Sequence, residues 1–463
     1  MTRYSKLAVG TLLLFTAFSS CQKQIKEQKA EESIMSAARE KKPLEPGFAE
    51  NSMVLYWNDK VATVLSAPMN QPTRTRNFAI IEIAVHDALN NIKPKYERYA
   101  LQERTQHADH NAAIASAAYW AIKGLNRQGT FPVDTWYSES LATIPDGMSK
   151  ELGITVGKKA AEAIIANRAN DGFAQTILTS TTPANGTTPG AYRSTVTAVN
   201  YVPTQNLFPF RILPNWGTVM KPYVIESNQQ FRPEDGPYPV TSNEYTADFT
   251  EVKTKGARVG STRTGEEEQI AKFWSENRPS IMWNNIVRKA IENKKLDAWK
   301  TARLFALMHV AMAESINTQF NAAYYYYSWR PETAIRLAAT DGNANTQADP
   351  AWLPYLSETP TSVTPAVPGY PNGFAAYGGT TAEILRLFFN SDATSITITT
   401  TSTNPAITEL KPSLHFSSYS EAARSNSLAM IYSGWDFRKS VLDGETMGKQ
   451  IASYVFHHAF REE

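Results

Sequence analysis

The sequence is short of cysteine: Cys21 is the only one among its 463 residues. No intramolecular disulfide can therefore form. The chain also lacks a strong net charge, because 46 basic residues stand against 44 acidic ones. A protein with so small an excess of positive charge lacks the basic character of nucleic-acid-binding proteins. Nucleic acid is therefore excluded as a partner. The remaining composition, 42% hydrophobic and 19% charged, is that of a globular protein of one or two domains.

The N-terminal apolar run, residues 7–18, is too short to cross a bilayer as a stable helix. It follows two basic residues and precedes Ser19-Ser20-Cys21, a pattern typical of a bacterial secretory signal that ends in a lipobox. We predict that residues 1–20 are a lipoprotein signal peptide and that Cys21 is lipidated; a buried cysteine near the membrane is the alternative. Removal of that segment leaves 44 basic and 44 acidic residues. The predicted location is the bacterial cell envelope, on the periplasmic face or the outer membrane.

Beyond the signal, the composition predicts four further parts. Residues 21–48, rich in Lys, Glu, Gln and Ala, are expected to form a tether. Residues 49–176 should form an N-terminal helical lobe, because apolar residues recur at helical spacing in 78–92, 112–125 and 156–169. Residues 177–260 are expected to be an ordered loop excursion, since Pro, Thr, Gly and Asn dominate there up to about Asp248. Residues 261–463 should form a C-terminal helical bundle.

The C-terminal part has the strongest helical periodicity of the chain in residues 302–320. Six apolar residues fall on one face of that segment: Leu304, Leu307, Met308, Ala311, Met312 and Ile316. Further helices are predicted at 266–274, 380–389, 419–432 and 444–460, with a second Pro- and Asn-rich loop at 337–372. Alternation over residues 395–399 predicts one strand of a small surface hairpin. The fold class is therefore mainly α.

Three short segments carry the motifs of the C-terminal part. They are Tyr324-Tyr-Tyr-Tyr-Ser-Trp-Arg-Pro331, Pro368-Gly-Tyr-Pro-Asn-Gly-Phe374 and Met430-Ile-Tyr-Ser-Gly-Trp-Asp-Phe437. Their order and flanks resemble the oxyanion site of the vanadium-dependent haloperoxidase and type 2 phosphatidic acid phosphatase superfamily. Further segments, such as residues 84–90 and 168–172, resemble its bacterial secreted branch, so the resemblance extends from about residue 53 to the C-terminus. It implies a two-lobed helical bundle of the haloperoxidase and acid phosphatase type.

The same resemblance implies a site that binds vanadate or phosphate through a Lys, two Arg, a Ser, a Gly amide and two His. In this sequence Arg330 keeps the first Arg and Gly373 keeps the amide. The Lys position is Ala323, the Ser position is Asn372, and the acid–base His position is Phe374. The remaining two departures fall in the third segment, where the second Arg position is Met430 and the position of the nucleophilic or vanadium-binding His is Asp436.

These replacements change the charge of the site. A site for a multiply charged oxyanion needs several fixed donors and net positive charge, but one arginine and one carboxylate are left. We therefore predict that an Arg330–Asp436 ion pair replaces the anion site. No cofactor is expected, or vanadate if the family chemistry survives. Asp436 and Asn372 are too few ligands to argue for a divalent cation.

Several other residues have both a structural and a functional interpretation. His86-Asp87 could be a catalytic dyad, but a structural pair is favoured; His309 is expected to be a core histidine. His415 could supply a histidine to the oxyanion site, where the two family histidines are missing. His457-His458 are expected to be solvent-exposed rather than metal ligands, because adjacent helical residues point about 100° apart. Tyr324–Tyr327, Trp329, Phe374 and Trp435 could line an aromatic ligand cavity.

The leading functional hypothesis is a lipid-anchored haloperoxidase-like protein without haloperoxidase or phosphatase activity. Its remodelled cleft would bind a small molecule or an envelope protein, with Arg330, Asn372, Asp436, Tyr324 and Trp435 as candidate contacts. The alternative is an active vanadium-dependent haloperoxidase or acid phosphatase with a divergent site. A third possibility is a new hydrolytic activity centred on Asp436. The sequence does not predict an oligomeric state.

Overall fold

The computed structural model describes residues 51–176, 185–194, 213–274, 278–356, 364–365, 367–400 and 412–463. Within these ranges helices form nearly all of the regular structure, and the strands form one two-stranded sheet. The predicted mainly α fold is confirmed. The predicted signal peptide, Cys21 and the tether lie outside the described residues.

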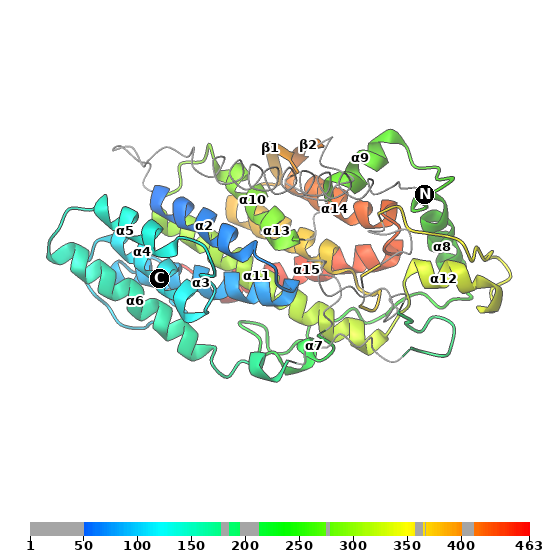
Figure 1. Cartoon of the computed structure of the whole chain (residues 1–463), viewed down its shortest axis with the longest axis horizontal. Coiled ribbons are helices and arrows are strands. Elements are labelled where there is room, and N and C mark those ends of the chain that lie inside the picture. The colour runs from blue at the N-terminus through cyan, green and yellow to red at the C-terminus, as the bar shows by residue number, and fades with distance from the viewer. Residues whose placement is uncertain are drawn as a thin grey trace, which may run out of the picture. The chain divides into compact units, whose positions relative to one another are not determined.

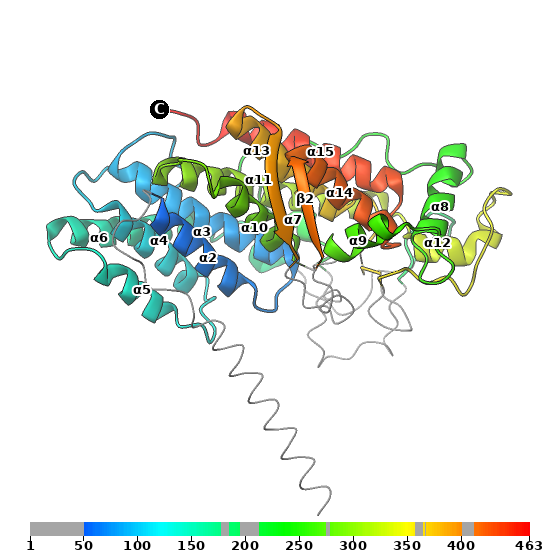
Figure 2. The same cartoon turned by 90° about the horizontal axis from the view of Figure 1, so that it is seen from above.

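The described helices fall into three groups, one at each end of the view and one between them (Figures 1 and 2). One end contains α2 (Ser52–Leu65), α3 (Gln71–Ile92), α4 (His110–Gly124), α5 (Val133–Ala142) and α6 (Met148–Asn167). The other end contains α8 (Asn243–Lys255), α9 (Gly265–Trp274) and α12 (Pro331–Leu337). Between them lie α10 (Pro279–Ile291), α11 (Ala298–Tyr326), α13 (Gly373–Phe389), α14 (Tyr419–Tyr432) and α15 (Arg438–His458). Short turns complete the set: α7 (Trp216–Val219), η1 (Phe173–Gln175) and η4 (Ala338–Thr340).

Helix α11 is the central element, and it contacts α2, α3, α7, α13 and α15. The side chain of Asp297 caps its N-terminus by accepting the Lys300 N–H at 2.7 Å. The six apolar residues predicted to share one face are all buried, but residues on the other faces are buried as well. A helix buried all round is the core of its domain. Residues 50–463 accordingly form one compact unit.

Helices α13 and α15 pack closely because glycines line their contact. A Cβ at Gly379 would lie 2.1 Å from the Glu445 carbonyl oxygen, and one at Gly444 would lie 2.3 Å from the Asn372 carbonyl oxygen. The Asn372 N–H also donates to the Ser440 carbonyl at 3.0 Å. The start of α13 is thus fixed against the first turn of α15, which holds the second and third segments together.

The structure has a helix inside the stretch that was predicted to be loop. Helix α8 begins after Ser242, whose side chain accepts the Tyr245 N–H at 3.0 Å. The last proline before it is Pro239, so the backbone N–H groups that follow are all available for helical hydrogen bonds. The prolines upstream led to the prediction of a loop for the whole stretch, so this 13-residue helix was not predicted.

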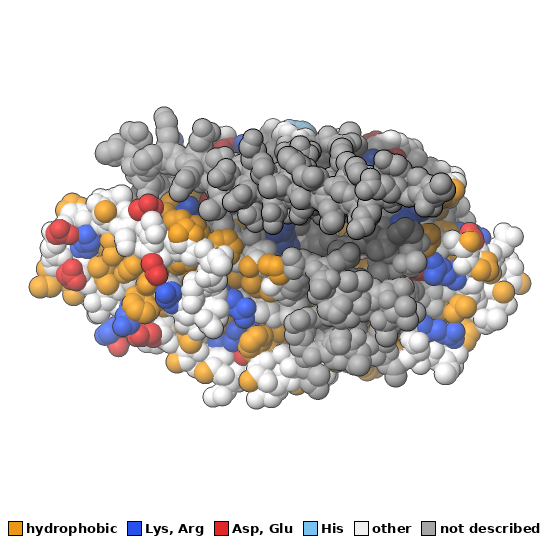
Figure 3. All heavy atoms as spheres, viewed as in Figure 1, with side chains coloured by type: hydrophobic (Ala, Val, Ile, Leu, Met, Phe, Trp, Pro, Cys, Tyr) orange, Lys and Arg blue, Asp and Glu red, His pale blue; other side chains and the backbone are white. Residues whose placement is uncertain are grey.

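The predicted hairpin is confirmed by strands β1 (Ala393–Thr399) and β2 (Ser413–Ser418), which pair antiparallel. Basic, acidic and hydrophobic side chains are interspersed on the described surface that faces the viewer in Figure 3 over α4, α5 and α6. In the described ranges, no helix combines the length and the apolar character that crossing a bilayer requires.

Candidate functional site

The three segments singled out in the sequence meet at the ends of helices. Arg330 immediately precedes α12, Asn372 immediately precedes α13, and Asp436 lies two residues before α15. Main-chain hydrogen bonds fix their mutual positions. The Gly369 N–H donates to the Ser328 carbonyl at 2.8 Å, which joins the first two segments.

The predicted ion pair between Arg330 and Asp436 is confirmed. Arg330 Nη1 lies 2.9 Å from Asp436 Oδ2, and the two side chains are only 7% and 2% exposed. The same guanidinium donates from Nε to the Val367 carbonyl at 2.8 Å and from Nη1 to the Trp435 carbonyl at 3.0 Å. Its orientation is therefore set by the carbonyl of the residue just before the second segment and by a carbonyl of the third segment.

Asp436 has two further side-chain donors. Asn372 Nδ2 donates to Oδ2 at 2.6 Å, and the Ser440 hydroxyl lies 3.2 Å from Oδ1. Burial raises the pKa of Asp436, while Arg330, Asn372 and Ser440 act in the opposite direction. The side-chain oxygen Oδ1 of Asn372 is used as well, because it accepts the Ala375 N–H at 2.7 Å as the cap of α13. The cluster of Arg330, Asn372, Asp436 and Ser440 thus satisfies its own hydrogen bonds, and we call it the closed cluster.

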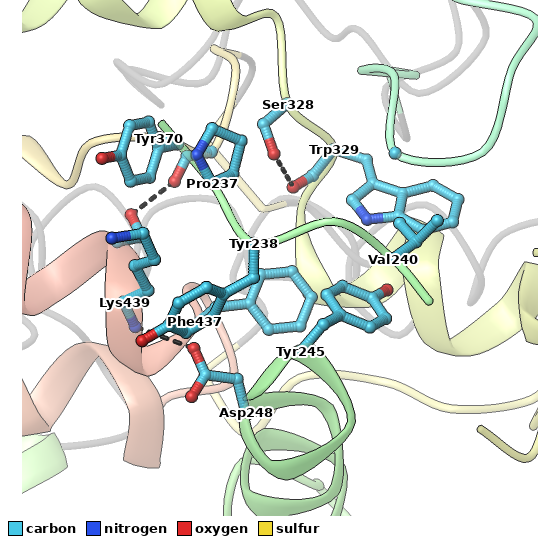
Figure 4. Close-up of a pocket in the computed structure, with 13 residues that line it drawn as sticks. Pro237, Tyr238, Val240, Tyr245, Asp248, Ser328, Trp329, Tyr370, Phe437 and Lys439 are labelled. Carbon is cyan, nitrogen blue, oxygen red and sulfur yellow. Dashed lines mark hydrogen bonds between the residues drawn. The ribbon is translucent and has the colours of Figure 1, made fainter. Parts of the chain in front are cut away.

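A cavity of about 50 Å³ lies beside the closed cluster. Six side chains give it its chemistry: Tyr238, Tyr245, Asp248, Trp329, Phe437 and Lys439. Tyr245 and Asp248 project from α8, while Phe437 and Lys439 come from the start of α15 (Figure 4). Ser440 belongs to both places, since it lines the cavity and contacts Asp436.

Comparisons with known proteins match the region that contains the three segments. The model of the VCPO second helical-bundle domain matches residues 303–462, which contain all three segments. The vanadium chloroperoxidase of Curvularia inaequalis is 22% identical over 416 residues, which cover 75% of this chain and 67% of that protein. The C-terminal part of the chain thus resembles the second helical-bundle domain of this family model, and the similarity to the chloroperoxidase extends beyond it.

Solved structures of similar proteins share the fold. A bacterial vanadium-dependent iodoperoxidase has a TM-score of 0.70 at 22% identity, over 90% of this chain and 98% of that one. An apo bacterial vanadium-dependent chloroperoxidase has a TM-score of 0.63 at 16% identity, over 84% and 93% of the two chains. The chain thus shares the fold of these two structures.

The remaining superfamily positions carry no side-chain donor. Ala323 on α11 and Met430 on α14 are buried, 1% and 0% exposed. Phe374 packs against Trp435, with ring centroids 6.1 Å apart. Gly373 keeps its place at the start of α13, but a Cβ there would lie 3.4 Å from the carboxamide carbon of Gln319. Gln319, whose Nε2 donates to the Pro371 carbonyl at 3.0 Å, therefore fills space beside this glycine.

The four tyrosines of the first segment separate in the structure. Tyr325 is 63% exposed. Tyr326 donates to the Pro233 carbonyl, and Tyr327 ends α11 with a left-handed backbone at φ 50°. The Tyr324 hydroxyl is buried with no hydrogen-bond partner in the described part of the chain. None of the four is among the residues that line the cavity, whereas Trp329 is.

His86 and Asp87 have structural roles on α3. His86 Nε2 lies 3.0 Å from the Glu97 carbonyl oxygen, and burial lowers its pKa to about 4. Asp87 accepts three successive backbone N–H groups, those of residues 99–101, at 2.6 to 2.9 Å. The pair anchors the loop after α3, which agrees with the structural interpretation.

The other histidines lie away from the closed cluster. His309 is fully buried, stacks on Phe78 at 4.2 Å and lies 3.0 Å from Asn284 Oδ1; burial lowers its pKa to about 3. His415 is exposed on β2 and pairs with Thr397, so it does not refill the site. His457 and His458 are exposed at the end of α15. Among the described residues, no group of three or more His, Cys, Asp or Glu is placed to hold a metal ion.

Four residues of this region were not singled out in the sequence: Gln319, Ser440, Tyr245 and Asp248. Ser440 could have been found, because it follows Asp436 by one helical turn. Tyr245 and Asp248 are spaced three apart, as neighbours on one helix face are. This spacing was not recognised, because the residues that form α8 were predicted to be loop.

Proposed function

We propose that this protein is a lipid-anchored member of the superfamily that no longer oxidises halides or hydrolyses phosphate esters. Instead of carrying out either reaction, the protein binds a small molecule in the remodelled cleft beside the closed cluster. The observation that carries this proposal is the buried ion pair of Arg330 with Asp436. An arginine that could hold an oxyanion is instead paired with a carboxylate of the same chain.

The residues at the superfamily's anion site do not fit vanadate or phosphate. The only cationic side chain at these positions is Arg330, and its Nη1 already has two acceptors. The carboxylate of Asp436 adds a negative charge where a multiply charged anion would have to lose its hydration. No histidine is present there to attack phosphorus, hold vanadium or protonate an oxygen. No step of the superfamily's chemistry can be assigned to the side chains at these positions.

The competing function is an active haloperoxidase or phosphatase, which the names of the relatives favour. Titration of the purified protein with orthovanadate, followed by calorimetry and by ⁵¹V NMR, separates the two. We expect no saturable binding up to millimolar vanadate and no bromide- or iodide-dependent oxidation by hydrogen peroxide. Hydrolysis of p-nitrophenyl phosphate should equal the buffer rate. The chloroperoxidase of Curvularia inaequalis serves as the positive control.

Saturable vanadate binding together with halide oxidation would overturn the proposal. The Arg330→Gln variant then locates the activity, since it removes the one guanidinium at the site. Activity lost in this variant belongs to the closed cluster. Activity that persists in the Arg330→Gln variant comes from another part of the chain. The proposed loss of activity would then be wrong, but the interpretation of the Arg330–Asp436 ion pair would stand.

Lipid anchoring at Cys21 is the second part of the proposal, supported by the pattern of residues 3–21. We expect the full chain, expressed in a bacterium, to partition with membranes and to be released by the Cys21→Ala substitution. Mass spectrometry of the mature N-terminus should find an acylated cysteine at position 21. A mature protein that begins elsewhere would contradict this part alone.

A further inference from the structure

The cavity beside the closed cluster contains a carboxylate without a cationic partner. Asp248 is 8% exposed, and its Oδ2 accepts the backbone N–H of Lys439 at 2.8 Å. No basic side chain of the described residues makes an ion pair with it. The two nearest are engaged elsewhere: Arg438 pairs with Glu251, and Lys439 Nζ lies 2.9 Å from Asp443 Oδ2.

The cavity also contains a hydroxyl group without a partner. Tyr245 is 4% exposed, and its Oη makes no hydrogen bond of normal geometry among the described residues. Burial raises the pKa of Tyr245, and the adjacent Trp329 side chain, which interacts with the hydroxyl only weakly, slightly lowers it. A buried hydroxyl that gives up water without a replacement costs about 1–3 kcal/mol. An unpaired hydroxyl and an unpaired carboxylate in one cavity are polar groups that a ligand would satisfy.

The other walls of the cavity are aromatic. The rings of Tyr238, Tyr245 and Phe437 lie together between Asp248 and Trp329 in Figure 4. Tyr245 and Phe437 have ring centroids 5.6 Å apart. The ring of Tyr238 already accepts one cation, since Lys439 Nζ lies 4.8 Å from its centroid. Aromatic faces attract cations through their quadrupole, and the attraction grows as the cation loses water.

We infer that this cavity binds a small organic cation, a protonated or methylated amine, with Asp248 as its counter-ion. The inference rests on the proposed function, in which the cleft holds a small molecule. The aromatic rings surround the alkyl groups, and the Tyr245 hydroxyl accepts a hydrogen bond from an N–H or from a hydroxyl of the ligand. A cavity of about 50 Å³ has room for a few water-sized groups, which limits the ligand to a compact amine.

The charge of the cavity distinguishes this class from the alternatives. An anion would be repelled by Asp248, because both compensating basic groups are paired with other carboxylates. A neutral polyol could hydrogen-bond to both polar groups, but it would leave the buried charge without a counter-ion. Burial raises the pKa of Asp248 to about 6, so the carboxylate is ionised at neutral pH despite its surroundings.

Calorimetric titration at pH 7.5 tests the inference with a matched series of probes. The cations are methylammonium, trimethylammonium and tetramethylammonium; tert-butanol is the neutral probe of similar bulk, and acetate is the anion. We expect at least one ammonium ion to bind saturably and at least about tenfold more tightly than tert-butanol, which corresponds to about 1.4 kcal/mol. Acetate should not bind.

Three variants locate the site. Asp248→Asn keeps the shape and removes the charge, so cation affinity should fall at least about tenfold. Tyr245→Phe should lower it by a smaller factor, about two- to fivefold, since one neutral hydrogen bond is lost. Asp134→Asn removes a carboxylate that is 72% exposed on α5, far along the chain from the cavity, and should leave affinity unchanged. Circular dichroism and the melting temperature confirm that each variant is folded.

Two results would overturn the inference. If tert-butanol binds as tightly as trimethylammonium and Asp248→Asn does not weaken either, the cleft binds a small molecule but not a cation; the proposed function then survives. If no ammonium probe binds to folded wild-type protein, the ligand class is wrong. The vanadate and halide assays decide the proposed loss of activity separately, because neither involves Asp248.

Discussion

Asp436 and Asp248 are two buried carboxylates, one in the closed cluster and one in the cavity that Ser440 also lines. They differ in how many hydrogen-bond and ionic partners surround them. Asp436 has a guanidinium, a carboxamide and a hydroxyl as partners, all from side chains of this chain. Asp248 has one backbone N–H. The first is a completed network, while the second is left with an unpaired charge next to the unpaired hydroxyl of Tyr245.

Under the proposed function, the difference indicates which of the two places a ligand would complete. A buried polar network that satisfies itself contributes rigidity and has nothing to offer a ligand. A buried group that lacks its partner destabilises the free protein, and such groups persist where a ligand completes them. The stability effect of removing each carboxylate should therefore have opposite signs, which the following substitutions test.

The largest effect is expected for Asp436→Ala, because it leaves the Arg330 guanidinium buried without its carboxylate. Removing one partner of a buried ion pair typically costs about 3–5 kcal/mol of unfolding free energy. Urea denaturation followed by circular dichroism measures the loss. The double variant Arg330→Met/Asp436→Leu should recover most of it, since no charge remains unpaired. A loss below about 1 kcal/mol in the single variant would mean that Arg330 finds another partner.

Asp248→Asn should instead stabilise the protein at pH 7.5, by about 1–3 kcal/mol. Burial, with a smaller contribution from Glu251, raises the pKa of Asp248 from 3.8 to about 6, while the Lys439 N–H and the charges of Arg438 and Lys439 act against it. The native state thus binds the proton more tightly than the unfolded state. The stability contributed by that proton is present below pH 4 and is lost as pH rises through about 6.

Urea denaturation from pH 4 to 8 follows this dependence. The gap between the Asp248→Asn variant and wild type should be smallest at pH 4 and grow through pH 6, since asparagine mimics the neutral acid at every pH. A variant that is less stable than wild type at pH 7.5 would contradict the description of Asp248 as an unpaired group.

The sequence could predict the Arg330–Asp436 ion pair because both residues lie in segments that align with the family motifs. The resemblance implies that the two positions face one anion, so a carboxylate at the second position implied their pairing. Ser440 lies outside these segments and was not predicted. The sequence could not show that Gln319 fills the space beside Gly373, because this depends on how α11 passes the start of α13.

The cavity was beyond prediction for a different physical reason. Its walls come from residues 237–248, 328–329, 369–370 and 437–440, and no motif marks their meeting. The prolines that precede α8 also concealed the helix that presents Tyr245 and Asp248 side by side. Packing of distant segments, not local propensity, makes this site.

Ser440→Ala should have an intermediate effect on stability. Its hydroxyl lies 2.6 Å from the Gly369 carbonyl oxygen and 3.2 Å from Asp436 Oδ1, and the residue is 2% exposed. Losing one buried donor costs about 1 kcal/mol. Ser138→Ala is the control, because the Ser138 hydroxyl bonds a carbonyl on the exposed side of α5 and should cost less than half as much. Equal losses in the two variants would mean that the closed cluster does not depend on Ser440.

The smallest change in stability is expected for Tyr245→Phe. Removing a buried hydroxyl that has no partner should leave the unfolding free energy unchanged or raise it by up to about 1 kcal/mol. Tyr377→Phe provides the contrast, because the Tyr377 hydroxyl is buried 2.6 Å from Thr75 Oγ1 and its loss should destabilise by about 1 kcal/mol. Melting temperatures of both variants, measured with and without trimethylammonium, extend the test to the ligand. The shift caused by the cation should shrink in Tyr245→Phe and persist in Tyr377→Phe, since only the first hydroxyl lines the cavity.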